Sequence, residues 1–226
     1  MGLQEHYESV TMWYGVPAQT LALTDYFGFS GSGPSEHNYQ ATSPTRYNIT
    51  SRFELGVDHL NGNASLPEVF AATTMAASMH RGESSFDVQL LAKNRGCMLR
   101  RTLDLASANQ KAFVSVRSAA TRGEWADAGT FFTAGSNTVV FSDPKSETAP
   151  PTASEVVQTS NRRFRQEEFL LPAALTKNSE SMSVRMRYVQ VDTELFPGRP
   201  FAQHGWTELE YSVYCFVEPP PLAEMA

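Results

Sequence analysis

The sequence has few cysteines, no long hydrophobic run and no excess of basic residues. Its 226 residues include 2 cysteines, and 18 lysines and arginines against 24 aspartates and glutamates give a net charge of −6. We expect Cys97 and Cys215 to be reduced thiols in a core, because two cysteines are too few for a disulfide scaffold, with a single bridge between them as the alternative. No apolar run approaches the roughly 18–20 residues of a membrane span. We therefore expect no membrane association.

Basic clusters and targeting signals are also scarce. The arginine pairs at 100–101 and 162–163 are too short to form the positive stripe from which phosphate binding draws its affinity, so we expect no nucleic-acid partner. The first ten residues, MGLQEHYESV, lack the basic and apolar regions of a signal peptide. They leave the localisation open, and a longer parent protein could still be secreted.

Cofactor and metal motifs are missing as well. His37, His59 and His80 have spacings that match no known metal site, and the cysteines are not in a CxxC pair. The glycine-rich segment at 28–33 lacks the ending of a phosphate loop. We expect neither a cofactor nor a bound metal.

Short alternating segments between turn residues are the dominant pattern. They are rich in Val, Phe, Tyr, Thr and Leu, and long amphipathic helical patterns are absent, which predicts an all-β fold, a β-sandwich or barrel. In 181–189 the even positions are apolar and most odd ones polar, as in a strand with one buried face. The predicted strands are 9–14, 19–24, 48–55, 85–92, 98–103, 112–117, 138–142, 163–170, 181–190 and 207–217. The proline-rich stretch 143–159 is interpreted as a surface loop.

The segment 26–63 differs in composition from the rest of the chain. It concentrates Gly, Ser, Asn, Tyr, His and acidic residues, which suit a site in loops better than a core. Aromatic rings interleaved with hydrogen-bonding groups are typical of sugar sites, and two carboxylates are the minimum for glycoside hydrolysis. Glu36 and Glu54 are the candidates, with Asp25, Asp58 and Glu68 as equal contenders on composition alone.

The aromatic residues outside this segment are assigned to a core or an interface. Trp13, Tyr14, Trp206 and the pair at 131–132 belong to this group. Trp125 is also assigned there, although the tripeptide Gly-Glu-Trp at 123–125 is typical of an exposed turn that leads into a strand.

Seven motifs in a fixed order resemble a known family. They are YESVTMWY at 7–14, SRFELGVDH at 51–59, GCMLRRTLD at 96–104, NQKA at 109–112, GEW at 123–125, EFLLP at 168–172 with LT at 175–176, and WTELEY at 206–211. Together they are similar to motifs of the domain-of-unknown-function family 2961, which includes glycoside hydrolase family 172.

The resemblance implies a jelly-roll β-sandwich and a retaining furanosidase that acts on fructofuranosyl or arabinofuranosyl linkages without a cofactor. Glu36 and Glu54 match the two catalytic glutamates best, with Glu54 provisionally the nucleophile and Glu36 the acid/base. Retention requires two carboxyl groups about 5–5.5 Å apart. The residues expected to bind substrate are Tyr39, Phe53, Asp58, His59 and His37.

The resemblance also implies an organisation and an assembly. Residues 1–24 would be remnant strands that close a first jelly roll, 25–80 would carry the site, 81–218 would form a C-terminal jelly roll, and 219–226 would be a tail. Family members assemble into trimers and larger oligomers, so we expect a homo-oligomer. A non-catalytic jelly-roll module that binds carbohydrate or builds an oligomer is the alternative, and a chain that does not fold alone is a third possibility.

Overall fold

The structure is a computed structural model. It describes residues 9–10, 19–49, 52–54, 67–69, 74–79, 81–136, 138–142, 154–158, 164–191 and 203–217. Side chains are described within 20–46, 81–136, 164–191 and 205–217.

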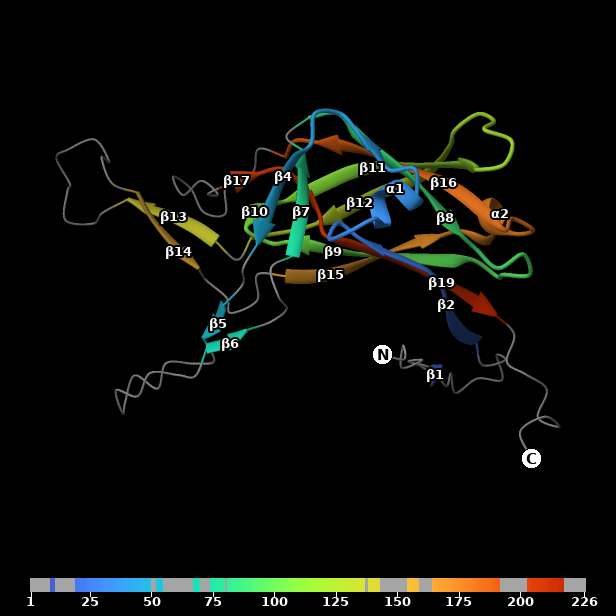
Figure 1. Ribbon diagram of the computed structural model, residues 1–226, viewed down its shortest axis with the longest axis horizontal. Coiled ribbons are helices and arrows are strands. Elements are labelled where there is room, and N and C mark those ends of the chain that lie inside the picture. The colour runs from blue at the N-terminus through green and yellow to red at the C-terminus, as the bar shows by residue number, and fades with distance from the viewer. Residues whose placement is uncertain are drawn as a thin grey trace.

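Two five-stranded antiparallel sheets form the body of the molecule, and Figure 1 shows them as two layers, one above the other. The first sheet has the order β1-β2-β19-β9-β15 and the second has the order β12-β11-β16-β8-β3. The first sheet comprises β1 (Ser9–Val10), β2 (Gln19–Gly28), β19 (Glu210–Val217), β9 (Cys97–Asp104) and β15 (Phe164–Leu171). The second comprises β12 (Ala126–Thr133), β11 (Gln110–Ser118), β16 (Ser181–Val189), β8 (Glu83–Gln89) and β3 (Gln40–Ala41).

Smaller elements flank this sandwich. One three-stranded sheet contains β18 (Trp206–Glu208), β7 (Thr74–Met79) and β4 (Thr45–Ile49). The two-stranded pairs are β10 (Ser107–Ala108) with β17 (Gln203–His204), β13 (Thr138–Ser142) with β14 (Ser154–Gln158), and β5 (Arg52–Glu54) with β6 (Pro67–Val69). The helices are α1 (Gly33–Glu36) and α2 (Ala173–Thr176). Within the described ranges, no helix is long and apolar enough to cross a membrane.

The core fills the space between the two sheets. The predicted alternation in 181–189 is confirmed, because Met182, Val184 and Met186 are buried while Arg187 is exposed. In β11, Val114 is buried and the neighbouring Phe113 is partly exposed, again as the alternation predicts. Trp206 and Tyr211 enter the same core, so the assignment of Trp206 to the core is confirmed. The all-β jelly-roll β-sandwich predicted from the sequence is therefore the fold.

Several predicted strands differ from the observed ones. The segment predicted as one strand at 48–55 contributes to two strands, β4 and β5, and the segment predicted at 207–217 is divided at Leu209 between β18 and β19. The interpretation of 143–159 as a loop is wrong in part, because residues 154–158 form β14, which pairs with β13. The strands β7 and β12 were not predicted, since alanines and glycines weaken their alternation.

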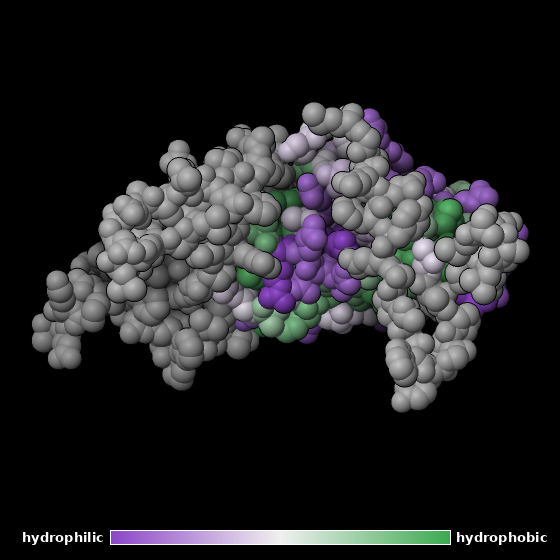
Figure 2. Space-filling view, turned by 90° about the horizontal axis from the view of Figure 1, so that it is seen from below, coloured by the Kyte–Doolittle hydropathy of each residue, from purple (hydrophilic) through white to green (hydrophobic). Residues whose placement is uncertain are grey.

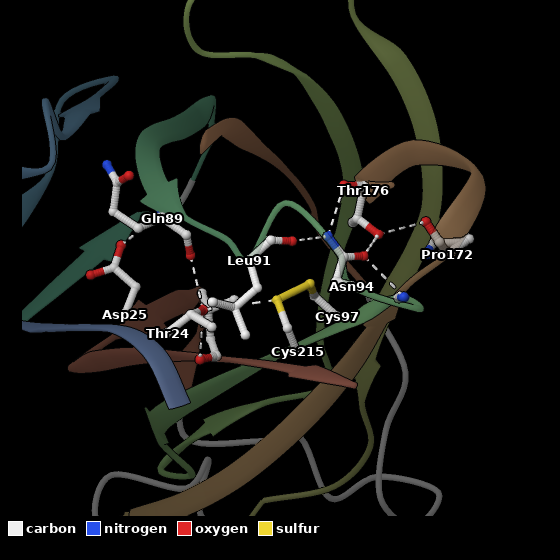
Figure 3. The surroundings of a disulfide bond; sticks show 11 residues. Thr24, Asp25, Gln89, Leu91, Asn94, Cys97, Pro172, Thr176 and Cys215 are labelled. Carbon is white, nitrogen blue, oxygen red and sulfur yellow. Dashed lines mark hydrogen bonds between the residues drawn. A yellow bond between two sulfur atoms is a disulfide. The ribbon is translucent and has the colours of Figure 1, made fainter. Parts of the chain in front are cut away.

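The expectation of two reduced thiols is wrong. Cys97 and Cys215 are directly opposite each other in β9 and β19, and their sulfur atoms form a disulfide. Both side chains are completely buried. Figure 3 shows the bridge with Thr24 of β2 beside it, whose Oγ1 lies 3.9 Å from the sulfur of Cys215. The sequence could not show this pairing, because the two residues are 118 positions apart.

Asn94 connects the turn between β8 and β9 to the short helix α2. Its amide nitrogen donates to the carbonyl oxygens of Leu91 at 2.6 Å and Thr176 at 2.9 Å. Its oxygen accepts from the backbone nitrogen of Gly96 at 3.0 Å and from the hydroxyl of Thr176 at 2.7 Å. Figure 3 shows this group next to the disulfide. Because the side-chain amide of Asn94 is buried and makes all four of these hydrogen bonds, it fixes the turn to the helix.

The outer face of the first sheet is mixed in character. Figure 2, which views the molecule from that side, shows hydrophilic side chains gathered in the middle with hydrophobic surface beside them. Arg100 and Glu168 form an ion pair on this face, while Leu23 and Leu170 are 47% and 59% exposed. The expected domain boundary at residue 24 falls inside β2, which pairs with β19 in this sheet.

Candidate functional site

The two predicted catalytic glutamates lie on different elements. Glu36 is the last residue of α1, where its side chain is exposed and accepts a hydrogen bond from the hydroxyl of Ser32 at 2.7 Å. Glu54 is the last residue of β5, and its side chain is outside the described part of the structure. The distance between the two carboxyl groups is therefore not defined, and their catalytic role stays a prediction.

The predicted substrate-binding residues are only partly covered by the structure. Phe53 lies in β5, and its side chain is outside the described residues. Asp58 and His59 lie outside them altogether. His37 and Tyr39 are described, and both have partners within the protein.

His37 is packed as a structural residue between α1 and β2. One ring nitrogen lies 3.0 Å from Oδ1 of Asp25 and the other 2.8 Å from the carbonyl oxygen of Gly33. Its ring stacks on Phe27, with 4.4 Å between the ring centroids. The carbonyl oxygen of His37 accepts the backbone N–H of Asp87 at 2.8 Å. His37 therefore fixes the segment after α1 against β8.

Tyr39 belongs to a buried network around Glu208. The Tyr39 hydroxyl donates to Oε2 of Glu208 at 2.6 Å. The other carboxylate oxygen accepts three hydrogen bonds, from Ser84 at 2.6 Å, Trp206 at 2.9 Å and Tyr211 at 2.7 Å. Burial, and then the charge of Glu208, raise the pKa of both Tyr39 and Tyr211 well above the ordinary value. A carboxylate held by four donors is a structural anchor in the core.

Arg101 is a buried cation whose charge interacts with this network. It is completely buried, with its guanidinium carbon 3.3 Å from the ring centroid of Trp206 and 5.0 Å from that of Phe131. Burial lowers the pKa of Arg101 to about 10, against the opposing effects of Tyr211 and Glu208. Its charge is therefore held by aromatic faces and by the field of Glu208.

A small polar hollow opens on the outer face of the second sheet. Its volume is about 210 Å³. It is lined by residues from β3, β8, β11 and β16, from the turn after β11 and from the segment after α1. These residues are Asn38, Gln40, Ser85, Phe86, Asp87, Arg117, Arg122, Trp125 and Ser183.

Asp87 organises one wall of this hollow. Arg122 binds its carboxylate through both terminal nitrogens, at 2.7 Å to Oδ2 and 3.3 Å to Oδ1. The hydroxyl of Ser183 donates to Oδ1 at 2.6 Å, and the amide of Asn38 donates to Oδ2 at 2.9 Å. The wall is therefore set before any ligand arrives, and its carboxylate charge is balanced by a guanidinium.

Trp125 forms the aromatic part of the hollow. It is partly exposed and follows the turn after β11. The guanidinium carbons of Arg117 and Arg185 lie 4.3 and 4.4 Å from the ring centroid. Both arginines project from the outward face of the second sheet, since their neighbours Val116 and Val184 are buried. The indole is thus positioned over the sheet by cation–π contacts.

The sequence interpretation missed this hollow. It assigned Trp125 to a core or interface, whereas the indole is partly exposed and outside the core between the sheets, and it did not select Asp87 or Arg122. The signals available were the outward register of β8 and β16 and the turn at 123–125. They were insufficient because only sheet pairing places Asp87 opposite Ser183, and Arg117 opposite Ser183 on the other side.

No group of three or more His, Cys, Asp or Glu side chains among the residues that the structure describes could hold a metal ion.

Comparisons with known proteins give similarities in structure and none in sequence. No protein-family model matches the chain, and no curated protein matches it. The K2 cleaved adhesin domain of Lys-gingipain has 8% identity and a TM-score of 0.38, over 88% of this chain and 98% of that one. A carbohydrate-binding module studied for specific mannan recognition has 7% identity and a TM-score of 0.39, over 88% and 99%.

A third similar structure is a family 35 carbohydrate-binding module from Clostridium thermocellum. It has 9% identity and a TM-score of 0.31, over 78% of this chain and 96% of that one. The structural neighbours of the chain thus include β-sandwich carbohydrate-binding modules and adhesin domains. At these identities and scores, the likeness carries no argument about function.

Proposed function

We propose that the chain is a carbohydrate-binding β-sandwich module whose ligand lies in the hollow beside Trp125. The observation that carries this proposal is the combination of one partly exposed indole with a ring of side chains already bonded to one another. A sugar offers an apolar ring face for stacking and hydroxyl groups at its edge, and the hollow presents the partner for each.

The polar wall supports this proposal through its chemistry. The side-chain amides of Asn38 and Gln40 each carry an acceptor oxygen and donor N–H groups, and Arg122 carries further N–H donors, so sugar hydroxyls meet groups of both kinds. The bonds of Arg122 and Asn38 to Asp87 hold these side chains in place before binding. Less side-chain entropy is then lost when a ligand binds.

The size of the hollow favours recognition of a single sugar residue. Pockets for drug-sized ligands hold about 300–1,000 Å³, while this hollow holds about 210 Å³. It lies on an outward sheet face, so the remainder of a polysaccharide chain can extend past it. We expect weak to moderate affinity, since one site of this size buries little surface.

Affinity electrophoresis and calorimetry with a panel of neutral and acidic polysaccharides test the proposal. Trp125→Ala is expected to weaken binding at least tenfold, because the stacking of the sugar ring on the indole is lost. Phe132→Ala is the matched control, since Phe132 is 49% exposed and lies in β12, outside the hollow. Failure of every polysaccharide to bind, or equal binding by Trp125→Ala, would contradict the proposal.

Furanoside hydrolysis stays a prediction that rests on the sequence resemblance. It is tested by the release of aryl alcohol from α-arabinofuranosides and fructofuranosides, with Glu36→Gln and Glu54→Gln beside the unchanged chain. Turnover that both variants lose while they remain folded would establish an enzyme. A folded chain without turnover fits the binding module.

A further inference from the structure

Arg117 is a cation in the hollow that has no carboxylate partner among the described residues. The other ion pairs on this face join Arg122 to Asp87 and Arg185 to Glu83. Arg117 lines the hollow, and its Nε is buried without a hydrogen-bond partner. A guanidinium group in a hollow without a carboxylate partner from the protein is a candidate for contact with an anionic ligand.

The position of Arg117 relative to Trp125 indicates which substituent the sugar ring would carry. The guanidinium carbon lies 4.3 Å from the indole centroid. A sugar ring stacked on the exposed part of this indole would therefore have a substituent within reach of the guanidinium. Guanidinium groups bind carboxylates with two parallel hydrogen bonds, a geometry that an ammonium group does not offer.

The charge around the hollow favours an anionic ligand. Asp87 is neutralised by Arg122. Further cations, Lys111 and Arg187, project from the same outer face, where they lie 5.8 and 5.3 Å from the ring of Phe113. Against five basic residues on or beside this face, Lys111, Arg117, Arg122, Arg185 and Arg187, the same register places three acidic ones, Glu83, Asp87 and Asp127. Local positive potential attracts anionic ligands.

We propose that the hollow selects a carboxylated sugar, a uronic acid residue, whose carboxylate is bound by Arg117. This inference rests on the proposed carbohydrate-binding function and names the ligand class of the same site. Sulfated sugars share the anionic character, but a planar carboxylate fits the planar guanidinium fork better.

Matched polysaccharides test the inference. Polygalacturonate, alginate and glucuronoxylan are each compared by calorimetry with the carboxyl-reduced form of the same polymer. At least one acidic polymer is expected to bind ten times more tightly than its reduced form. Arg117→Gln is expected to weaken binding of the acidic polymer about ten times more than binding of its reduced form, so that the preference is lost, while Arg117→Lys keeps part of it.

The control variant is Arg187→Gln, a loss of the same charge on the same face but outside the hollow. Equal losses for Arg117→Gln and Arg187→Gln, or equally tight binding of a sulfated polysaccharide such as dextran sulfate, would overturn the uronate assignment. Equal binding of acidic and reduced polymers would overturn it too, while the carbohydrate-binding function would stand. Failure of all polymers, with folded protein by circular dichroism, would overturn both.

Discussion

Glu208 is the common acceptor of a hydrogen-bond network in the core. It is completely buried, and its carboxylate accepts from Ser84, Tyr39, Trp206 and Tyr211. Glu208→Ala would leave three buried donors and the partly buried hydroxyl of Tyr39 without this acceptor. Removing one member of a buried charged network costs about 3–5 kcal/mol. We expect a loss of this size in the free energy of unfolding, measured by urea denaturation.

The matched control for this prediction is two residues further along the chain. Glu210 is partly exposed and accepts from Tyr26 at 3.0 Å and Thr102 at 3.3 Å. Glu210→Gln should change the free energy of unfolding by less than about 1 kcal/mol, as is usual for exposed polar contacts. Similar losses for Glu208→Ala and Glu210→Gln would show that the buried network has no special weight.

Tyr39 makes the free energy of unfolding depend on pH in the alkaline range. Burial and Glu208 raise the pKa of this phenol above its ordinary value of about 10. The folded chain therefore keeps a proton that the unfolded chain releases as the pH rises through about 10. The stability that this proton contributes is complete below that pH and decreases above it, with a slope of up to about 1.4 kcal/mol per pH unit.

Tyr39→Phe tests this linkage. The variant has no proton to release at residue 39, so its stability should fall less steeply between about pH 9 and about pH 11 than that of the unchanged chain. The lowered pKa of Arg101 acts in the opposite direction, but it acts in both proteins and cancels in the comparison. Urea denaturation across this pH range measures both slopes, and identical slopes would contradict the assignment.

Predictions for single residues were correct where the pattern of apolar residues along the sequence is enough to decide burial. Val114, Met182 and Trp206 are core residues as the patterns indicated. The contacts of His37 and Trp125 could not be predicted in this way, because they depend on partners in other elements. Asp25 fixes His37 from β2, and Arg185 contacts Trp125 from β16. No local pattern contains such pairings.

The turn between β8 and β9 provides the clearest prediction for a single element. Asn94 makes four hydrogen bonds in a buried position, two within the turn and two to Thr176 of α2. Asn94→Ala would leave several of these backbone and hydroxyl groups unpaired, so we expect a loss of at least about 2 kcal/mol in the free energy of unfolding. Lys93→Ala, at the exposed neighbouring position, is the control and should have almost no effect.

Hydrogen exchange can localise the effect of Asn94→Ala. The amides of Gly96 and Asn178 should exchange faster in the variant, since Gly96 donates to Asn94 and Asn178 donates to the nearby Ala92. A loss of stability spread evenly over both sheets, without faster exchange at these amides, would mean that Asn94 does not hold the turn to α2.

Strands were predictable from the sequence to the extent that their side chains alternate. β9, β11 and β16 pair along long registers in the centres of the sheets, and their apolar residues repeat with period two. β12 is at the edge of the second sheet, and only its last part buries large apolar side chains, such as Phe131. An edge strand with a weak alternation leaves little signal.

At the scale of the whole molecule, the two sheets have different outer surfaces. The outer face of the second sheet combines several arginines and the hollow with the exposed rings of Phe113 and Phe132, whereas that of the first sheet exposes Leu23 and Leu170 beside an ion pair. Composition could not predict this division, because 41% hydrophobic and 19% charged residues describe the chain as a whole. Sheet pairing decides which residues share a face, and with it the position of a site.

The disulfide between β9 and β19 constrains the whole chain rather than one sheet. It joins residues 118 positions apart. The chain-entropy account gives about 4.7 kcal/mol for a closed loop of roughly 100 residues, and measured values for native bridges are about 2–5 kcal/mol. We expect the double variant Cys97→Ala and Cys215→Ala to lose an amount within that range in urea denaturation.

The comparison must separate the bridge from the packing of its sulfur atoms. For this purpose the protein is reduced under denaturing conditions, without alkylation of its cysteines, and refolded in the presence of reductant. The reduced protein keeps both sulfur atoms and lacks only the bond between them. If the bond acts on the unfolded chain, this reduced protein and the double alanine variant should show similar losses, with the variant slightly worse because it also leaves a small cavity. If the reduced protein is as stable as the oxidised one, the bridge adds nothing, and the contacts between β9 and β19 alone hold these strands together.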